Sequence, residues 1–184
     1  MTVLTDYALA GVSAWLGFRL LGSSRFWALA FFALELAALL GGTWHGFFKS
    51  DLLWKATTLS VGVASFGMIV GSALATTTGV ARRFLVGFAA LKLLAYTVWM
   101  LGHDDFIWVI ADTASALLIV GLLHLWRRNG WMLAGVAVSI LAGMAQASGL
   151  ALHEHFNHND LYHVIQIIAM FLFYRGVDLQ AGRA

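Results

Sequence analysis

The sequence contains no cysteine and no proline, and only 11% of its 184 residues are charged. Without cysteine the chain cannot form a disulfide, a cysteine-ligated iron–sulfur cluster or a thiolate nucleophile. Without proline, a break in a helix has to arise at one of the 19 glycines. Soluble domains contain about 25% charged residues. The low charge, together with 61% hydrophobic residues, therefore indicates that most side chains face lipid.

Seven apolar runs are each long enough to cross a membrane, which takes roughly 20 apolar residues in a helix. They lie at about 5–22, 26–48, 52–76, 80–101, 105–126, 131–152 and 158–177. The turns between them are short, as they are between sequential antiparallel helices of one bundle. The sequence therefore predicts an all-α polytopic membrane protein, with one seven-transmembrane-helix domain over residues 1–184. We expect it in the bacterial inner (cell) membrane.

The basic residues predict how the bundle is oriented. All eight arginines lie in or beside alternate gaps between the apolar runs or towards the C-terminus, whereas six of the seven histidines lie towards the opposite side. The arginines are Arg19, Arg25, Arg82, Arg83, Arg127, Arg128, Arg175 and Arg183. Because basic loops stay in the cytoplasm, we expect the N-terminus outside and the C-terminus in the cytoplasm. There is no basic cluster of the kind that binds nucleic acid, so no nucleic-acid partner is expected.

The densest polar segment, residues 153–163, precedes and begins the last apolar run. Asn157 is a good helix N-cap, and Asp160 three residues later completes a capping pattern. His163 follows inside the predicted helix. His158 lies five residues before His163, so the two side chains point in different directions unless His158 precedes the helix. They can share a metal ion only in that case.

His45 lies about one turn from the outer end of the second apolar run, at the depth expected for His163 on the same side. Imidazoles with a nearby carboxylate are typical zinc ligands. A zinc ion with an open position lowers the pKa of its bound water to ~7 and makes a hydrolytic nucleophile. Asp51 begins the third run on the same side. The sequence therefore suggests a metal site.

Three ionisable residues lie inside apolar runs, where an ionisable group costs about 2.5–3.5 kcal/mol on insertion scales. Glu35, Lys92 and Asp112 are therefore expected to face the bundle or to be paired. One interpretation is an ion pair between Glu35 and Lys92. Asp112 is expected either near a metal ion or in contact with a histidine that binds one.

This pattern resembles the CREST superfamily of seven-helix membrane hydrolases, which includes alkaline ceramidases, adiponectin and progestin receptors, and haemolysin-III-like proteins. His45 matches the family's second-helix histidine, and His163 matches the second histidine of its seventh-helix HxxxH motif. Asn159 stands at the first histidine of that motif, with His158 one residue earlier. Gly41 stands where the family has a serine. The resemblance implies a zinc-dependent amidase or esterase that acts on lipid.

The favoured hypothesis is a membrane-embedded zinc-dependent hydrolase of a lipid amide or ester, with its site near the extracytoplasmic side. His45, His158 and His163 would bind zinc, and Asp112 or Asp51 would position water or act as general base. A proton or small-ion transporter, a haem-binding cytochrome and a non-catalytic metal-binding membrane protein are the alternatives. The sequence does not determine the oligomeric state.

Overall fold

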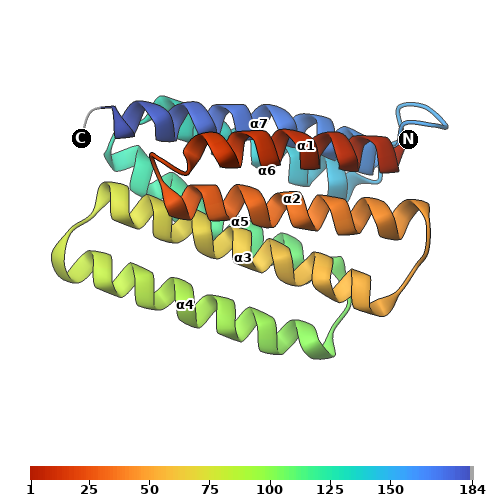
Figure 1. Cartoon of the computed structure of the whole chain (residues 1–184), viewed down its shortest axis with the longest axis horizontal. Helices are drawn as coiled ribbons and strands as arrows, with labels where there is room; N and C mark the ends of the chain where they lie inside the picture. Colours follow the sequence, from red (N-terminus) through yellow and green to blue (C-terminus); the bar gives the residue numbers. More distant parts are fainter. Residues whose placement is uncertain (183–184) are drawn as a thin grey trace.

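The computed structural model describes residues 1–182, which form seven α-helices joined by short loops (Figure 1). The helices are α1 (Thr2–Leu20), α2 (Arg25–Gly46), α3 (Asp51–Thr76), α4 (Gly79–Gly102), α5 (Phe106–Trp126), α6 (Gly130–Ser148) and α7 (His158–Ala181). Five of them, α2 to α6, are long and apolar enough to cross a membrane. These five helices are typical of an integral membrane protein. Arg183 lies outside the described residues.

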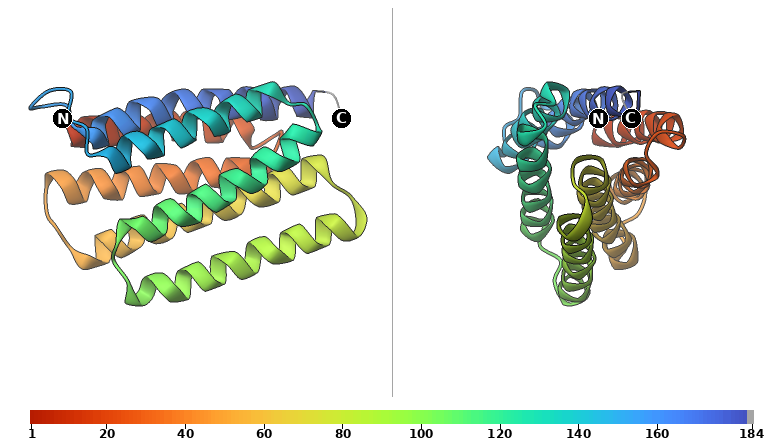
Figure 2. Two further views of the ribbon diagram at one scale, coloured as in Figure 1. Left: turned by 180° about the vertical axis from the view of Figure 1, so that it is seen from behind. Right: turned by 90° about the vertical axis from the view of Figure 1, so that its left-hand side faces the viewer.

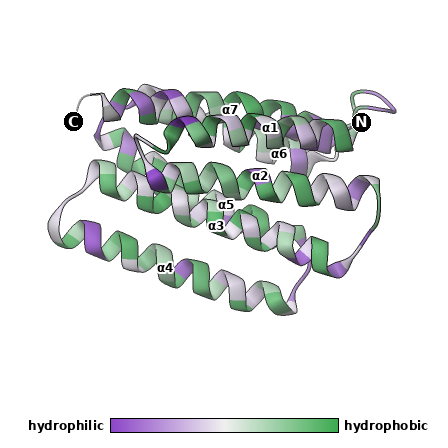
Figure 3. Cartoon of the chain, in the orientation of Figure 1, coloured by the Kyte–Doolittle hydropathy of each residue, from purple (hydrophilic) through white to green (hydrophobic). Residues whose placement is uncertain are grey.

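Six of the helices form a ring, and the remaining helix, α4, lies outside it. Contacts link α6 to α7, α7 to α1, α1 to α2, α2 to α3, α3 to α5 and α5 to α6. Helix α4 packs against α3 and projects from the ring, as the end-on view shows (Figure 2). The two termini lie at opposite ends of the bundle (Figure 1). Hydrophobic residues dominate the middle of most helices, and hydrophilic ones gather towards the two ends (Figure 3).

A glycine lets α1 and α2 approach each other closely where polar residues meet. A Cβ atom added at Gly42 would lie 2.9 Å from Cβ of Asp6 and 3.0 Å from Cε1 of Tyr7. No other residue type fits at that distance without a shift of one helix. Small residues commonly permit such close packing between helices of membrane proteins. Gly42 therefore brings the acidic side chain of α1 against α2.

Two predicted helix ends can be compared with the structure. The capping pattern at α7 is confirmed, because Asn157 and Asp160 form a complete capping box. The predicted end of the sixth run at residue 152 is wrong, because α6 ends at Ser148. Gly149 follows with a φ of 67°, the left-handed conformation that commonly ends a helix. Residues 149–157 then form the loop to α7.

The predicted ion pair between Glu35 and Lys92 is also wrong. Lys92 forms its salt bridge with Asp112, and its Nζ also donates to the Asp112 carbonyl oxygen at 3.0 Å. The pair joins α4 to α5, and the two side chains are only 14% and 6% exposed. Asp112 is thus paired, as an ionisable group inside an apolar helix is expected to be.

Candidate active site

His163 lies at the centre of a buried polar cluster at one end of the bundle. This end, called here the N-terminal end, carries residue 1 and the loop 149–157. The imidazole is 7% exposed and projects from the first turns of α7 towards α1. Its Nε2 lies 3.0 Å from Oδ1 of Asp6, and its Nδ1 lies 3.0 Å from Oγ1 of Thr5. Both ring nitrogens therefore contact neighbouring residues of one helix.

Asp160 is fully buried, and each of its carboxylate oxygens accepts a hydrogen bond. Its Oδ1 accepts a hydrogen bond from Thr5 Oγ1 at 3.0 Å. Its Oδ2 accepts from the backbone N–H of Asn157 at 2.9 Å, which completes the capping box. One side chain thus begins α7 and also holds the hydroxyl that contacts His163. The helix cap and the position of the histidine depend on the same residue.

Asp6 is buried but only half satisfied. Its side chain is 5% exposed, and among the described residues its Oδ2 has no hydrogen-bond partner. A buried polar atom without a partner costs roughly 1–3 kcal/mol, and more when it is charged. Such an atom needs an explanation, such as an ion, a water molecule or a reacting group. The free oxygen of Asp6 is therefore the strongest local indication of a ligand.

The cluster can move a proton along a defined line. Thr5 has one hydroxyl hydrogen, and three acceptors lie close to its oxygen: Thr2 carbonyl oxygen, Asp160 Oδ1 and His163 Nδ1, each at 3.0 Å. When His163 Nδ1 is the acceptor, Nε2 carries the proton and donates to Asp6. A hydroxyl group, an imidazole and a carboxylate then lie in sequence, as they do where an oriented histidine serves as general base.

His45 lies close to this cluster and is exposed at the end of α2. It lies within electrostatic range of His163 and of Asp160. Its ring packs edge-on against Trp44, with 5.1 Å between the centroids. Nearby, Tyr7 and Thr43 share a hydrogen bond of 3.1 Å that joins α1 to α2. The second and last helices thus present their histidines at the same end of the bundle.

The comparison with known families gives one match. A sequence model described as Family of unknown function (DUF6962) matches residues 1–181. The chain belongs to this family. No curated protein and no solved structure matches the chain. Membership of DUF6962 thus extends over all seven helices and assigns no activity to them.

Among the described residues, no hydrogen bond or salt bridge joins the other predicted site residues to the Asp6–His163 pair. His158 is the first residue of α7 and is partly buried. Asp51 is the first residue of α3 and is exposed. Asp112 is paired with Lys92 on α5 and α4. Neither α4 nor α5 belongs to the α7–α1–α2 side of the ring, where His163 and His45 lie.

Sequence reasoning missed Thr5 and Asp6 as members of the site. Asp6 carried a usable signal, because it is the only acidic residue within the first apolar run. An ionisable group in such a run is a candidate functional residue by default. Thr5 carried no comparable signal, since threonine is common in apolar helices. Its importance depends on partners 155 and 158 positions away in the sequence.

Zinc, which the resemblance to CREST hydrolases implies, can be assessed from the donors present. His45, His163 and Asp6 supply the nitrogen and oxygen ligands that zinc prefers. The oxygen of Asp6 without a partner fits the same chemistry. Across residues 1–182, no three or more His, Asp or Glu side chains are spaced closely enough to hold a metal ion. The donor types therefore fit zinc, and the site is not assembled as a metal centre.

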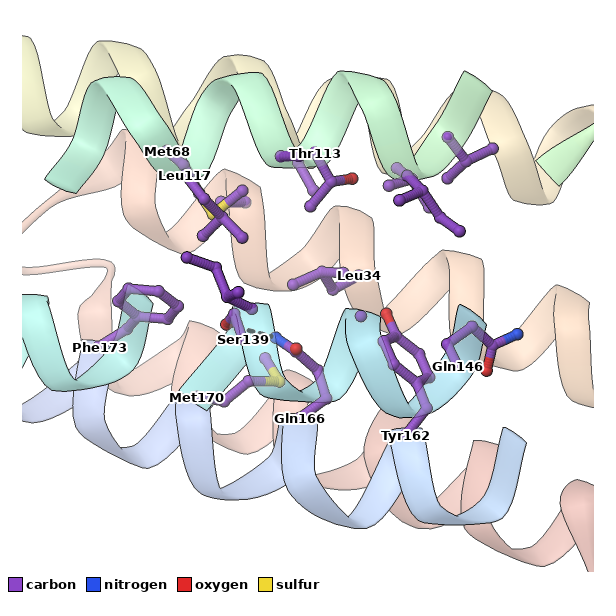
Figure 4. A pocket seen from close by; sticks show the side chains of 18 of the residues that line it. Leu34, Met68, Thr113, Leu117, Ser139, Gln146, Tyr162, Gln166, Met170 and Phe173 are labelled. Atoms are coloured by element: carbon purple, nitrogen blue, oxygen red, sulfur yellow. Dashed lines mark hydrogen bonds between the residues drawn. The ribbon is translucent and has the colours of Figure 1, made fainter. Parts of the chain in front are cut away.

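A cavity adjoins the cluster on the other side of α7. Its volume is about 310 Å³, and it is lined by residues of α2, α3, α5, α6 and α7. Tyr162, the neighbour of His163, directs its ring and hydroxyl into this space (Figure 4). The Tyr162 and His163 rings contact each other, with 5.3 Å between their centroids. The polar cluster and the cavity are thus separated by a single side chain.

Proposed function

We propose that the chain is a membrane-embedded hydrolase that cleaves an ester or amide bond of a lipid at the Asp6–His163 pair. One observation carries the proposal. A buried imidazole is held between a hydroxyl and a carboxylate, and within residues 1–182 one oxygen of that carboxylate has no partner. The adjoining apolar cavity supports a lipid as the substrate.

His163 supplies the proton transfer in the proposed reaction. Its Nδ1 accepts the proton of a water that displaces the Thr5 hydroxyl and attacks the carbonyl carbon, while its Nε2–H donates to Asp6. The imidazolium then returns the proton to the leaving alcohol or amine. Asp6 fixes the ring orientation and stabilises the imidazolium that forms. Thr5 and Asp160 orient the ring from the opposite side. General base catalysis of this kind contributes about 10²–10⁴-fold in rate.

Zinc is the proposed cofactor. A histidine that binds zinc through its free nitrogen cannot also be the general base. In a zinc-loaded form, His163 would therefore be a ligand together with His45 and Asp6, with His158 at the start of α7 as a further donor. A bound zinc ion would polarise the substrate carbonyl and activate water near neutral pH. Because both nitrogens of His163 already contact protein groups, one of these contacts has to open before the histidine can bind a metal.

The proposal also includes seven membrane spans, with the N-terminus outside and the C-terminus in the cytoplasm of a bacterial cell. The arginine pattern supports this orientation. It positions the cluster near the extracytoplasmic surface. A lipid would then reach the cavity from the outer leaflet.

A transporter for protons or small ions receives less support from the structure. Such a relay needs polar groups that follow one another across the bundle. Within the described part of the chain, the outer cluster, the Lys92–Asp112 pair and the buried His124 share no hydrogen bond with one another. His124 contacts Ser72 at 3.2 Å and Gln180 at 3.4 Å, at the opposite end of the bundle.

The test combines hydrolysis assays with metal analysis of the purified protein in lipid nanodiscs. The wild type is assayed with fluorogenic lipid esters and amides, beside Asp6→Asn, His163→Gln and the exposed control Glu154→Gln. We expect Asp6→Asn and His163→Gln to lose about 10²-fold or more of the rate, the lower end of general base catalysis. Glu154→Gln should retain it. Hydrolysis that persists unchanged in both Asp6→Asn and His163→Gln would overturn the proposal.

The zinc content of the purified protein tests the proposed cofactor separately. Zinc bound near one equivalent in the wild type, and lost in His45→Ala and His163→Gln, would support the proposed ligand set. An active enzyme without zinc would retain the role of His163 as base and remove zinc from the proposal.

A further inference from the structure

The cavity inside the ring of helices has the lining of a binding site. Most of its wall is apolar, and a few polar groups reach into it. Its volume of about 310 Å³ lies at the lower end of the range of roughly 300–1,000 Å³ found for ligand sites. The site is distinct from the Asp6–His163 cluster, because none of the cluster residues lines it.

Every polar side chain in the lining is uncharged. They are Thr113, Ser139, Gln146, Tyr162 and Gln166. Ser139 and Gln166 share a hydrogen bond of 3.4 Å across α6 and α7 (Figure 4). An ionised group inside an apolar cavity needs a partner of opposite charge, and this lining offers none. The lining therefore selects for an uncharged polar group.

The polar groups are not spread evenly along the cavity. Tyr162 and Gln146 lie towards the N-terminal end, and Gln166 with Ser139 lies about one turn deeper (Figure 4). Gln146 donates to Asn159 at 2.7 Å, but its buried Oε1 has no partner among the described residues. The far end is mostly apolar: Trp27 and Phe173 pack there at 5.3 Å between centroids, and the indole N–H of Trp27 is buried without a partner among the described residues. This gradient fits a molecule with one polar end and one apolar end.

The cavity also has an opening towards the side of the bundle. Ile140 and Met144 of α6 belong to its lining, yet they are 48% and 62% exposed. In a membrane this exposed part of α6 faces acyl chains. A lipid can therefore enter from the bilayer without passing through the polar end.

We infer that this cavity binds an uncharged single-chain lipid, such as a monoacylglycerol or a fatty-acid amide. Its polar group lies against Tyr162 and Gln146, and its chain extends towards Trp27 and Phe173. As an identification of the substrate class, this inference rests on the proposed function. As a binding site, it is tested without any turnover.

Gly143 provides the variant for the test. It lines the cavity, and a Cβ atom added there would meet no other atom within 4 Å. Gly143→Phe therefore fills the cavity without a clash at the backbone. The matched control is Gly87→Phe on α4, where an added Cβ is equally free and the position is exposed and outside the cavity.

Binding is measured with a radiolabelled glycerol monooleyl ether, which has the uncharged headgroup and no bond to hydrolyse. The protein is held in nanodiscs of saturated phosphatidylcholine, and oleate and lysophosphatidylcholine are the competitors. We expect saturable binding to the wild type and to Gly87→Phe, and a loss of about tenfold or more in Gly143→Phe, which is about 1.4 kcal/mol. Oleate and lysophosphatidylcholine should compete poorly.

Two results would overturn the inference. Equal competition by oleate would show that the cavity does not select against charge. Unchanged binding in Gly143→Phe would place the lipid elsewhere. Asp6→Asn separates this inference from the proposed function, because it should keep binding and lose hydrolysis. Hydrolysis that survives both Asp6→Asn and His163→Gln, with binding intact, would remove the catalytic proposal and leave the lipid site.

Discussion

At the scale of single residues, the buried carboxylates differ in how well their neighbours satisfy them. Asp160 has a donor for each oxygen and begins a helix. Asp6 and Asp112 each have one oxygen in contact with a basic side chain and one without a partner in the described chain. A group that only stabilises the fold gains from full satisfaction. Because Asp112 is equally incomplete, the feature that distinguishes Asp6 is the histidine that its other oxygen contacts.

Substitution of Thr5 tests whether its hydroxyl stabilises the cluster. Thr5→Val keeps the shape of the side chain and removes the hydroxyl, so Asp160 Oδ1 and His163 Nδ1 lose a shared neighbour at 3.0 Å. We expect the free energy of unfolding to fall by about 1–3 kcal/mol, the cost of leaving buried polar groups without partners. Denaturant unfolding in micelles measures the change.

Thr5→Ser is the control for this prediction, because it restores the hydroxyl with one methyl group fewer. It should recover most of the lost stability. If Thr5→Val and the wild type unfold at the same denaturant concentration, the hydroxyl does not contribute to the cluster.

The Lys92–Asp112 pair should behave as a structural unit. Asp112→Ala leaves a buried ammonium group without its counter-charge, which typically destabilises by about 3–5 kcal/mol. The double variant Lys92→Met with Asp112→Leu removes both charges, and we expect its stability to return close to that of the wild type. The thermal unfolding midpoints of the wild type, Asp112→Ala and the double variant measure this.

A catalytic role for Asp112 predicts another result for the same set of proteins. The double variant would then be stable but inactive. Recovery of both stability and hydrolysis would assign Asp112 to the fold alone.

At the scale of helices, the sequence predicted one helix end correctly and missed another. The cap of α7 depends on Asn157 and Asp160, three positions apart, and was predicted. The end of α6 was missed because the apolar Leu150, Ala151 and Leu152 seemed to continue the run after Gly149. The left-handed conformation of that glycine determines the end, and apolar composition does not report it.

Contacts between side chains that are far apart in the sequence could not be predicted in the same way. His45 and His163 were predicted at one end of the bundle from their depth in two runs. Lys92 was recognised as an ionisable residue inside a run and Asp6 was not, and the partners of both depend on which helices are neighbours. The ring order brings α7 against α1 and leaves α4 outside, and no local pattern specifies this order.

Alanine substitutions at Gly42 and at its neighbour Gly41 test how closely α1 must approach α2. A Cβ at Gly42 would lie 2.9 Å from Asp6 Cβ, whereas one at Gly41 would lie 3.6 Å from Thr57 Cγ2, an ordinary contact. Gly42→Ala should therefore push α1 away and destabilise by about 1–3 kcal/mol, as overpacking does. Gly41→Ala should be tolerated. Thermal unfolding of the two purified variants compares adjacent positions of one helix, and equal stability would contradict the close-approach argument.

At the scale of the whole molecule, an odd number of helices carries the chain from one end of the bundle to the other. The N-terminus and the loop 149–157 lie at the end that holds His163, and the arginine-rich turns lie at the opposite end. If all seven helices cross the membrane, the sidedness of any one loop determines the sidedness of the others. The proposed orientation then depends on the electrostatic preference of basic loops for the cytoplasm.

The absence of native cysteine makes this orientation directly measurable, because a single introduced thiol has no background. Glu154→Cys lies in the exposed α6–α7 loop, and Thr78→Cys lies in the exposed turn before Arg82 and Arg83. We expect a membrane-impermeant maleimide to label Glu154→Cys in intact cells, and to label Thr78→Cys only after permeabilisation. The reverse pattern would put the His163 cluster on the cytoplasmic side. Labelling of both in intact cells would mean that fewer helices cross the membrane between the two positions than the bundle requires.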